Sequence, residues 1–252
     1  MDFYSIVVLA ITVFSASFLQ AVTGIGYGVI AGPVLLVFFN GLEAIQISTI
    51  HNLLIAVLLF PFLCKHINHR MLWPILFGSS LGIAVGIYLQ TSVALVGLKL
   101  VAASMVFFVI VTLLIDLFGP QRQRRAVIEL ARFSWKSAGV GVFAGVMGGM
   151  LAMPGPIVAA WMSIKGYEKN EIRATVLAFF VVAYGSTLML YLVTTGLKEN
   201  VLQLSLAFVP VVLVGVYTGN RLARHLSEAI FRKILLLVLL ATFFLLLVSL
   251  SR

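Results

Sequence analysis

The sequence predicts an all-α membrane protein: a multi-pass helical bundle of two inverted repeats, each with a Gly/Pro-broken or re-entrant helix pair. The first reason is composition, because 62% of the residues are hydrophobic and only 10% are charged. With a mean hydropathy of +1.16, a chain of 252 residues cannot hide its apolar surface in a water-soluble globule. The second reason is a series of apolar runs of membrane-spanning length. The third is a glycine and proline pattern that occurs twice.

The apolar runs lie at residues 3–39, 45–63, 72–89, 93–118, 137–162, 174–194, 201–219 and 229–250. A spanning helix needs about 20 residues, so most runs fit one helix each. The run at 3–39 is too long for one straight span, and both it and the run at 137–162 contain the glycine and proline interruption. These two runs are expected to form hairpins or re-entrant pairs of half-helices.

The two interruptions repeat the same residues in the same order. Gly24, Gly28 and Pro33 recur at one common spacing as Gly145, Gly149 and Pro154. Glycine tolerates unusual backbone dihedrals and proline removes a backbone donor, so both free peptide groups from the helical pattern. Broken segments at matching places in two halves point to the substrate site of a transporter.

Basic residues concentrate in loops at 65–70, 121–136, 165–173 and 221–233. Short basic loops face the cytoplasm, and all four can do so only if each broken segment enters and leaves the membrane on one side. This solution places the N-terminus outside and orients the two halves oppositely. The predicted units are a first membrane repeat at 1–118, a basic cytoplasmic linker at 119–136 and a second membrane repeat at 137–252.

The breaks supply the candidate substrate site. Half-helices that begin after Gly28 and Gly149 would present free N–H groups and a positive dipole end to an anion. His51 lies in mid-span, where an ionisable group is a functional candidate. The candidate binding residues are Gly24, Gly26, Gly28, Pro33, Thr49, His51, Asn52, Gly145, Gly148, Gly149, Pro154, Arg173 and Thr175. Other polar groups that could line a cavity are Gln20, Thr23, Tyr184, Ser186 and Thr187.

Each candidate also has a purely structural explanation. The glycines could serve close helix packing, for which Gly141-x-x-x-Gly145 is suited. His51 could be a neutral histidine that is hydrogen-bonded by a neighbouring helix. Arg173 could be an interfacial topology anchor. Packing alone does not explain the matched prolines or the length of the run at 3–39.

The sequence gives little support for a proton relay, an enzyme or a metal site. The eight carboxylates fall in loops or near the ends of the runs, so no central proton relay is expected. The sequence has no HExxH motif and no Walker loop, and Cys64 is the single cysteine. We therefore expect no enzyme, no cofactor and no metal site. The net charge of +9 is explained by loop topology rather than by nucleic acid. The expected partners are a small anion and the lipid bilayer, and a homodimer is left open.

The glycine motifs resemble those of the sulfite exporter TauE/SafE family of bacterial membrane permeases. The resemblance rests on Thr-Gly-Ile-Gly-Tyr-Gly-x-x-x-Gly-Pro at 23–33, the glycine and proline pattern at 141–154, Arg173-Ala-Thr175 and Gly215-x-x-x-Gly219, and it covers essentially the whole chain. Tyr27 and Met153 depart from the family pattern and are expected to reshape the pocket. The resemblance implies a multi-pass protein of the bacterial inner membrane that exports small sulfur-containing anions.

The resulting hypothesis is a secondary transporter that exports a small anion, sulfite or an organosulfonate, by alternating access at a midplane site. The first alternative is a channel-like anion pore. A non-transporting membrane subunit is the weaker alternative, because no nucleophile or metal motif supports an enzyme.

Overall fold

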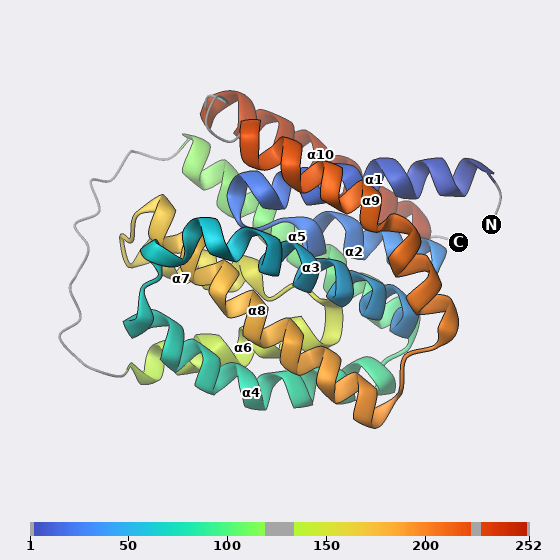
Figure 1. The fold of residues 1–252 in the computed structure, drawn as a ribbon, viewed down its shortest axis with the longest axis horizontal. Helices are drawn as coiled ribbons and strands as arrows, with labels where there is room; N and C mark the ends of the chain where they lie inside the picture. The colour runs from blue at the N-terminus through green and yellow to red at the C-terminus, as the bar shows by residue number, and fades with distance from the viewer. Residues whose placement is uncertain (1–2, 119–133, 223–227, 251–252) are drawn as a thin grey trace.

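The computed structural model describes residues 3–118, 134–222 and 228–250, and these residues form helices without any strand (Figure 1). The all-α prediction is confirmed. The helices of the first half are α1 (Phe3–Thr23), α2 (Tyr27–Phe38), α3 (Gly41–Leu63), the short 3₁₀ helix η1 (Cys64–His66), α4 (His69–Ser92) and α5 (Leu95–Phe118). Those of the second half are α6 (Trp135–Leu151), α7 (Gly155–Ile164), α8 (Lys169–Thr194), α9 (Glu199–Leu222) and α10 (Glu228–Leu250).

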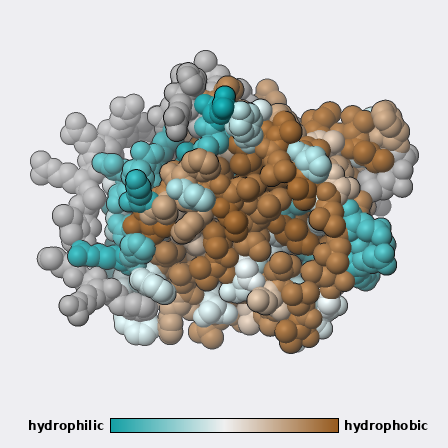
Figure 2. All heavy atoms as spheres, viewed as in Figure 1, coloured by the Kyte–Doolittle hydropathy of each residue, from teal (hydrophilic) through white to brown (hydrophobic). Residues whose placement is uncertain are grey.

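The chain is a multi-pass membrane protein. Six of the described helices are long and apolar enough to cross a bilayer: α1, α3 with η1, α4, α5, α8 and α9. Figure 2 shows hydrophobic residues over the middle of the visible face and hydrophilic residues at its two ends. Because the helices run between those ends in the same view, the apolar belt matches the hydrocarbon layer of a membrane (Figure 1).

Both long apolar runs break where the glycine and proline pattern predicts a break. The first break separates α1 from α2 at residues 24–26, and the second separates α6 from α7 at residues 152–154. With a rise of about 1.5 Å per residue, α2 and α7 are roughly 18 Å and 15 Å long, too short to cross a hydrocarbon core of about 30 Å. Each break therefore pairs a longer helix with a half-helix.

Each broken pair returns to the end of the bundle where it began. In Figure 1, α1 begins and α2 ends at the right, whereas α6 begins and α7 ends at the left. The connections from α3 to α4 and from α7 to α8 also lie at the left. The α3–α4 connection carries Lys65 and His66, and the α7–α8 connection carries Lys165 and Glu168 and is followed by Lys169 at the start of α8, so basic residues gather at one end of the molecule.

Helices of the two sequence halves pack against each other in a reciprocal way. The first helix of each half packs on the fourth helix of the other half: α1 on α9, and α6 on α4. The third helices, α3 and α8, pack on each other. Two related repeats would produce this pairing, although the inverted relation itself stays a prediction.

The α4 and α6 pair is held at backbone distance by two rows of glycine. A Cβ atom on Gly82 would overlap the carbonyl oxygen of Val142, and one on Gly141 would overlap that of Ile75. The glycines with such backbone contacts are Gly78, Gly82 and Gly86 on α4 and Gly141, Gly145 and Gly149 on α6. Small residues allow this approach, and van der Waals contact then drives association of helices in lipid.

This packing predicts different effects for two glycines on the same helix. Gly141→Ala should lower the free energy of unfolding by about 1–3 kcal/mol, because the new methyl group overlaps the backbone of α4. Gly139→Ala is the matched control, since a Cβ there meets nothing within 4 Å, and it should be neutral or slightly stabilising. Thermal unfolding in detergent measures both, and equal stability of the two variants would contradict the glycine contact.

Candidate functional site

The two breaks meet at one small cavity, which in this conformation has room for about one water molecule. It is lined by residues of the first break and its flanking helices, of α3, of the second break and of α8: Gln20, Ile25, Gly26, Gly28, Val29, Asn52, Ala152, Met153, Gly155, Pro156, Phe180 and Tyr184. All of them except Ile25 are buried. The cavity therefore lies among buried residues that are far apart in the sequence.

The first break is shaped by glycine and by one side-chain amide. Gly24 has a φ of 82° and Gly26 a φ of 147°, both in the region that favours glycine. Gly26 caps the N-terminus of α2, and Gln20 on α1 accepts a hydrogen bond of 2.9 Å from the backbone N–H of Tyr27. Gln20 thus takes up one of the N–H groups that the start of a helix leaves unpaired.

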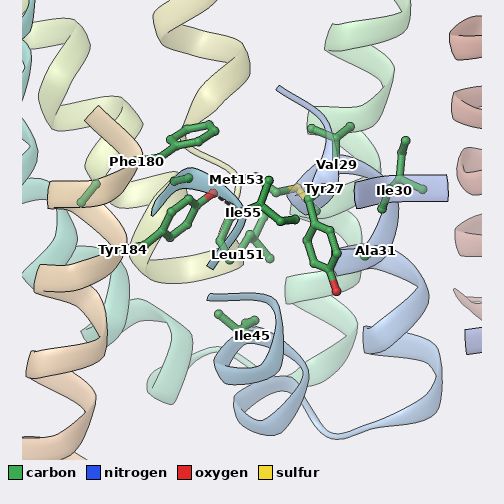
Figure 3. Packing of buried hydrophobic residues seen from close by; sticks show 14 of the residues in the cluster. Tyr27, Val29, Ile30, Ala31, Ile45, Ile55, Leu151, Met153, Phe180 and Tyr184 are labelled. Carbon is green, nitrogen blue, oxygen red and sulfur yellow. Dashed lines mark hydrogen bonds between the residues drawn. The ribbon is translucent and has the colours of Figure 1, made fainter. Parts of the chain in front are cut away.

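The second break turns on a left-handed residue and presses against the first. Ala152 has a φ of 54°, and its carbonyl oxygen accepts a hydrogen bond of 3.0 Å from the Tyr184 hydroxyl of α8. A Cβ on Gly28 would overlap that same carbonyl oxygen. Figure 3 shows Met153 between Phe180 and Tyr184 on one side and Tyr27 and Val29 on the other. The two breaks are in direct backbone contact.

Both half-helices begin at the cavity. The N–H groups of Gly28 and Val29 at the start of α2 have no hydrogen-bond partner among the described residues, and the same holds for Gly155 at the start of α7. The first N–H groups of a helix carry the positive end of its dipole. Two such ends face one enclosed space, an arrangement suited to an anion.

Two buried amide side chains complete the polar lining. Gln20 Nε2 and Asn52 Oδ1 have no hydrogen-bond partner within the described parts of the chain, and both residues are fully buried. Asn52 Nδ2 donates to the Ser48 carbonyl oxygen at 2.9 Å, which fixes the orientation of its amide. Together they offer one donor and one acceptor beside the two helix ends.

His51 lies beside this site but not in it. Its Nε2 lies 2.9 Å from the Ser205 carbonyl oxygen, and its Nδ1 lies 2.6 Å from the Tyr27 hydroxyl. A carbonyl oxygen only accepts, so Nε2 carries the proton and Nδ1 accepts from the tyrosine. Both ring nitrogens are occupied, and the geometry is that of a histidine that ties α2 and α9 to α3.

Of the predicted site residues, the cavity lining includes Gly26, Gly28 and Asn52. The lining leaves out Gly24, Pro33, Thr49, His51, Gly145, Gly148, Gly149, Pro154, Arg173 and Thr175. Thr49 donates to the Ile45 carbonyl oxygen of its own helix at 2.8 Å, and Thr175 accepts from the backbone N–H of Asn68 at 2.9 Å. These two hydroxyls serve local structure in α3 and in the loop before α4.

The remaining predicted residues support the breaks from outside the cavity. Pro154 caps α7 and packs against Gly148, and Pro33 is buried within α2. The second half-helix, α7, begins after Gly149 as expected but only at Gly155, because α6 continues through Gly149, which packs on α4. The expected start of the first half-helix after Gly28 is wrong, since α2 already begins at Tyr27. The second half-helix therefore starts later than the glycine repeat indicates.

Arg173 braces the first break. Its guanidinium donates to the Ala21 carbonyl oxygen in the last turn of α1, and its side chain packs against Gly24. A cation at this point also complements the negative end of the α1 dipole. The residue thus holds the end of α1 and is not in the cavity wall.

Sequence reasoning missed one aromatic wall of the cavity. Phe180 stands one helical turn before Tyr184 on α8, and the two ring centroids are 5.1 Å apart. Apolar residues on a membrane helix carry no signal that separates a cavity wall from ordinary packing. The spacing of four residues from Tyr184 was the one available indication.

An all-helical membrane bundle that encloses a cavity between two broken helices has the architecture of a membrane transporter. The sequence model of the sulfite exporter TauE/SafE family matches residues 9–246. The chain belongs to that family, which consists of transporters rather than enzymes.

A curated relative agrees with this class. The chain is 35% identical over 100 residues to "Probable inner membrane transporter protein TsaS" of Comamonas testosteroni. The matched stretch covers 39% of this chain and 41% of the relative, so the similarity spans about two fifths of each. No solved structure matches the chain.

The Tyr27 and His51 contact gives a prediction about stability. Tyr27→Phe should lower the free energy of unfolding by about 1–3 kcal/mol, because it leaves the buried Nδ1 of His51 without its donor. Tyr88→Phe is the control, since Tyr88 is 70% exposed, and a change within about 0.5 kcal/mol is expected there. Unfolding of both variants in detergent is the measurement, and a neutral Tyr27→Phe would contradict the contact.

Proposed function

We propose that this protein is a secondary transporter that exports a small anion, sulfite or an organosulfonate, by alternating access around the cavity between the two breaks. The observation that carries the proposal is the convergence of two half-helix N-termini on one buried space. Each helix N-terminus is equivalent to roughly half a positive charge, so two of them nearly balance one negative charge. No charged residue lines the cavity.

The side chains around the helix ends support an anion rather than a cation. Gln20 Nε2 and the N–H groups of Gly28 and Val29 are donors without a partner in the described chain. A cation would need several oxygen ligands, and the described residues contain no cluster of three or more acidic, histidine or cysteine side chains. The oxygens of sulfite or a sulfonate would accept these donors.

Burial of the lining supports a carrier over the alternative of a channel-like pore. Only Ile25 among the lining residues is partly exposed. An ion could reach this space only after helices move apart, which is what alternating access requires. A conductance in planar bilayers, with turnover far faster than a carrier allows, would favour the pore instead.

The test is efflux of radiolabelled sulfite from proteoliposomes, with variants that change the donors. Gln20→Glu keeps the oxygen that caps α2 but replaces the amide donor with a carboxyl group, so transport should fall about tenfold or more. Gln203→Glu is the matched control, because it makes the same chemical change at an exposed position of α9. It should transport like the wild type.

Two outcomes would overturn the proposal. If the wild-type protein moves neither sulfite nor any organosulfonate, the transport function fails. If Gln20→Glu transports as fast as Gln203→Glu, the site fails. Gly28→Ala is a second probe, since its methyl group would overlap Ala152 at the contact between the breaks, and it too should slow transport.

The shared position of the basic connections supports a cytoplasmic location for that end, with the N-terminus outside (Figure 1). The single native cysteine tests this orientation, because Cys64 lies in the connection between α3 and α4. A membrane-impermeant maleimide should label it in inverted vesicles but not in intact cells.

A control for this labelling comes from the other end of the bundle. Ser92 is exposed at the end of α4, so Ser92→Cys in a Cys64→Ser background should react in intact cells. The reverse pattern of labelling would show the opposite orientation.

A further inference from the structure

The cavity carries a polarity that an anion site does not require. Four donors without a described partner belong to residues that line it: Gln20 Nε2 and the N–H groups of Gly28, Val29 and Gly155. Asn52 Oδ1 is different, because it is an acceptor. A bare oxyanion offers acceptors alone and would leave Asn52 Oδ1 without a partner.

Neither amide can be turned round to remove this mismatch. The Nδ2 group of Asn52 donates to the Ser48 carbonyl oxygen at 2.9 Å, and a carbonyl oxygen accepts from donors only. Likewise, Gln20 Oε1 accepts from the Tyr27 backbone N–H, which can only donate. Flipping either side chain would place two donors or two acceptors against each other. The acceptor at Asn52 is therefore fixed by the backbone around it.

A buried acceptor without a partner is costly. Leaving such a group unsatisfied destabilises the empty site, and Asn52 is fully buried. The neighbouring hydroxyl of Tyr184 does not satisfy it, since that hydroxyl donates to the Ala152 carbonyl oxygen at 3.0 Å. A ligand that brings its own donor would remove this cost when it binds.

We infer that the cavity selects small oxyanions that also carry a hydrogen-bond donor, such as hydroxy-sulfonates, with the donor directed to Asn52 Oδ1. The anionic oxygens face Gln20 and the starts of α2 and α7, and the hydroxyl faces α3. The inference rests on the proposed function, since it assigns a substrate class to the same site. Asn52 is then a specificity-determining residue for a hydroxyl or an amine on the ligand.

The test uses pairs of ligands that have equal charge and differ by one hydroxyl. Ethanesulfonate is compared with hydroxyethanesulfonate, and propanesulfonate with hydroxypropanesulfonate, each bearing the hydroxyl at the terminal carbon. Binding to the purified protein in detergent is measured by calorimetry and by ligand-induced thermal stabilisation. In at least one pair, the hydroxylated ligand should bind about tenfold more tightly, because only it satisfies the buried acceptor.

Variants separate the acceptor from the rest of the site. Asn52→Leu should bring the affinity ratio of each pair close to one, because it removes the acceptor that only the hydroxylated ligand can use. Gln46→Leu is the matched control: Gln46 is a buried amide on the same helix, outside the lining, whose Nε2 donates to the Gly196 carbonyl oxygen at 2.9 Å. It should lower stability but keep the wild-type ratio.

The outcomes distinguish this inference from the function beneath it. If the wild-type protein binds both members of each pair equally, the acceptor is not read by the ligand and the inference is overturned, while the anion site stands. If Asn52→Leu keeps the preference, the role of Asn52 is overturned. If sulfite binds but no sulfonate does, the inference is overturned; if sulfite does not bind either, the proposed function itself fails. The wild-type comparison needs no variant, so the inference stays testable even if Asn52→Leu does not fold.

Discussion

The structure depends on one constraint: every backbone polar group inside a membrane must find a partner within the protein. A broken helix violates this rule unless other groups cover the break. Here the Thr23 hydroxyl accepts a hydrogen bond from the Ile25 N–H, and Gln20 Oε1 accepts one from the Tyr27 N–H. The Tyr184 hydroxyl donates to the Ala152 carbonyl oxygen. The N–H groups of Gly28, Val29 and Gly155 have no described partner, and these residues line the cavity. The hydrogen bonds that stabilise the breaks thus leave a few donors unpaired, and a ligand could accept from them.

The breaks could be predicted from the sequence because their cause is local. Glycine at positive φ and proline at a helix start act through their own backbone. These residues therefore indicate an interruption without any knowledge of tertiary contacts. Which polar residues line the cavity could not be predicted in this way. His51 and Asn52 are neighbours on α3, yet one ring is held by Tyr27 and Ser205 while the other side chain lines the cavity. Which of the two side chains lines the cavity depends on partners more than 20 residues away in the sequence.

The glycines show the same division between local and tertiary causes. Gly28 and Gly149 match in the repeat, but Gly28 lies at the contact between the breaks and Gly149 lies in the seam between α4 and α6. Equal sequence patterns therefore have unequal roles. Because α1 packs on α9 and α4 on α6, helices that move together during transport need not belong to one sequence half. In any rocking motion, each of the two moving groups of helices would contain helices from both sequence halves.

The seam between α4 and α6 also has a consequence for biogenesis. The ribosome delivers α4 to the membrane before α6 has been made, so the glycine row of α4 must wait in lipid without its partner. The backbone of α4 is paired along its own helix, but its van der Waals contact with α6 is missing until α6 has been made. The seam between α4 and α6 can therefore close only after synthesis of the second half has begun.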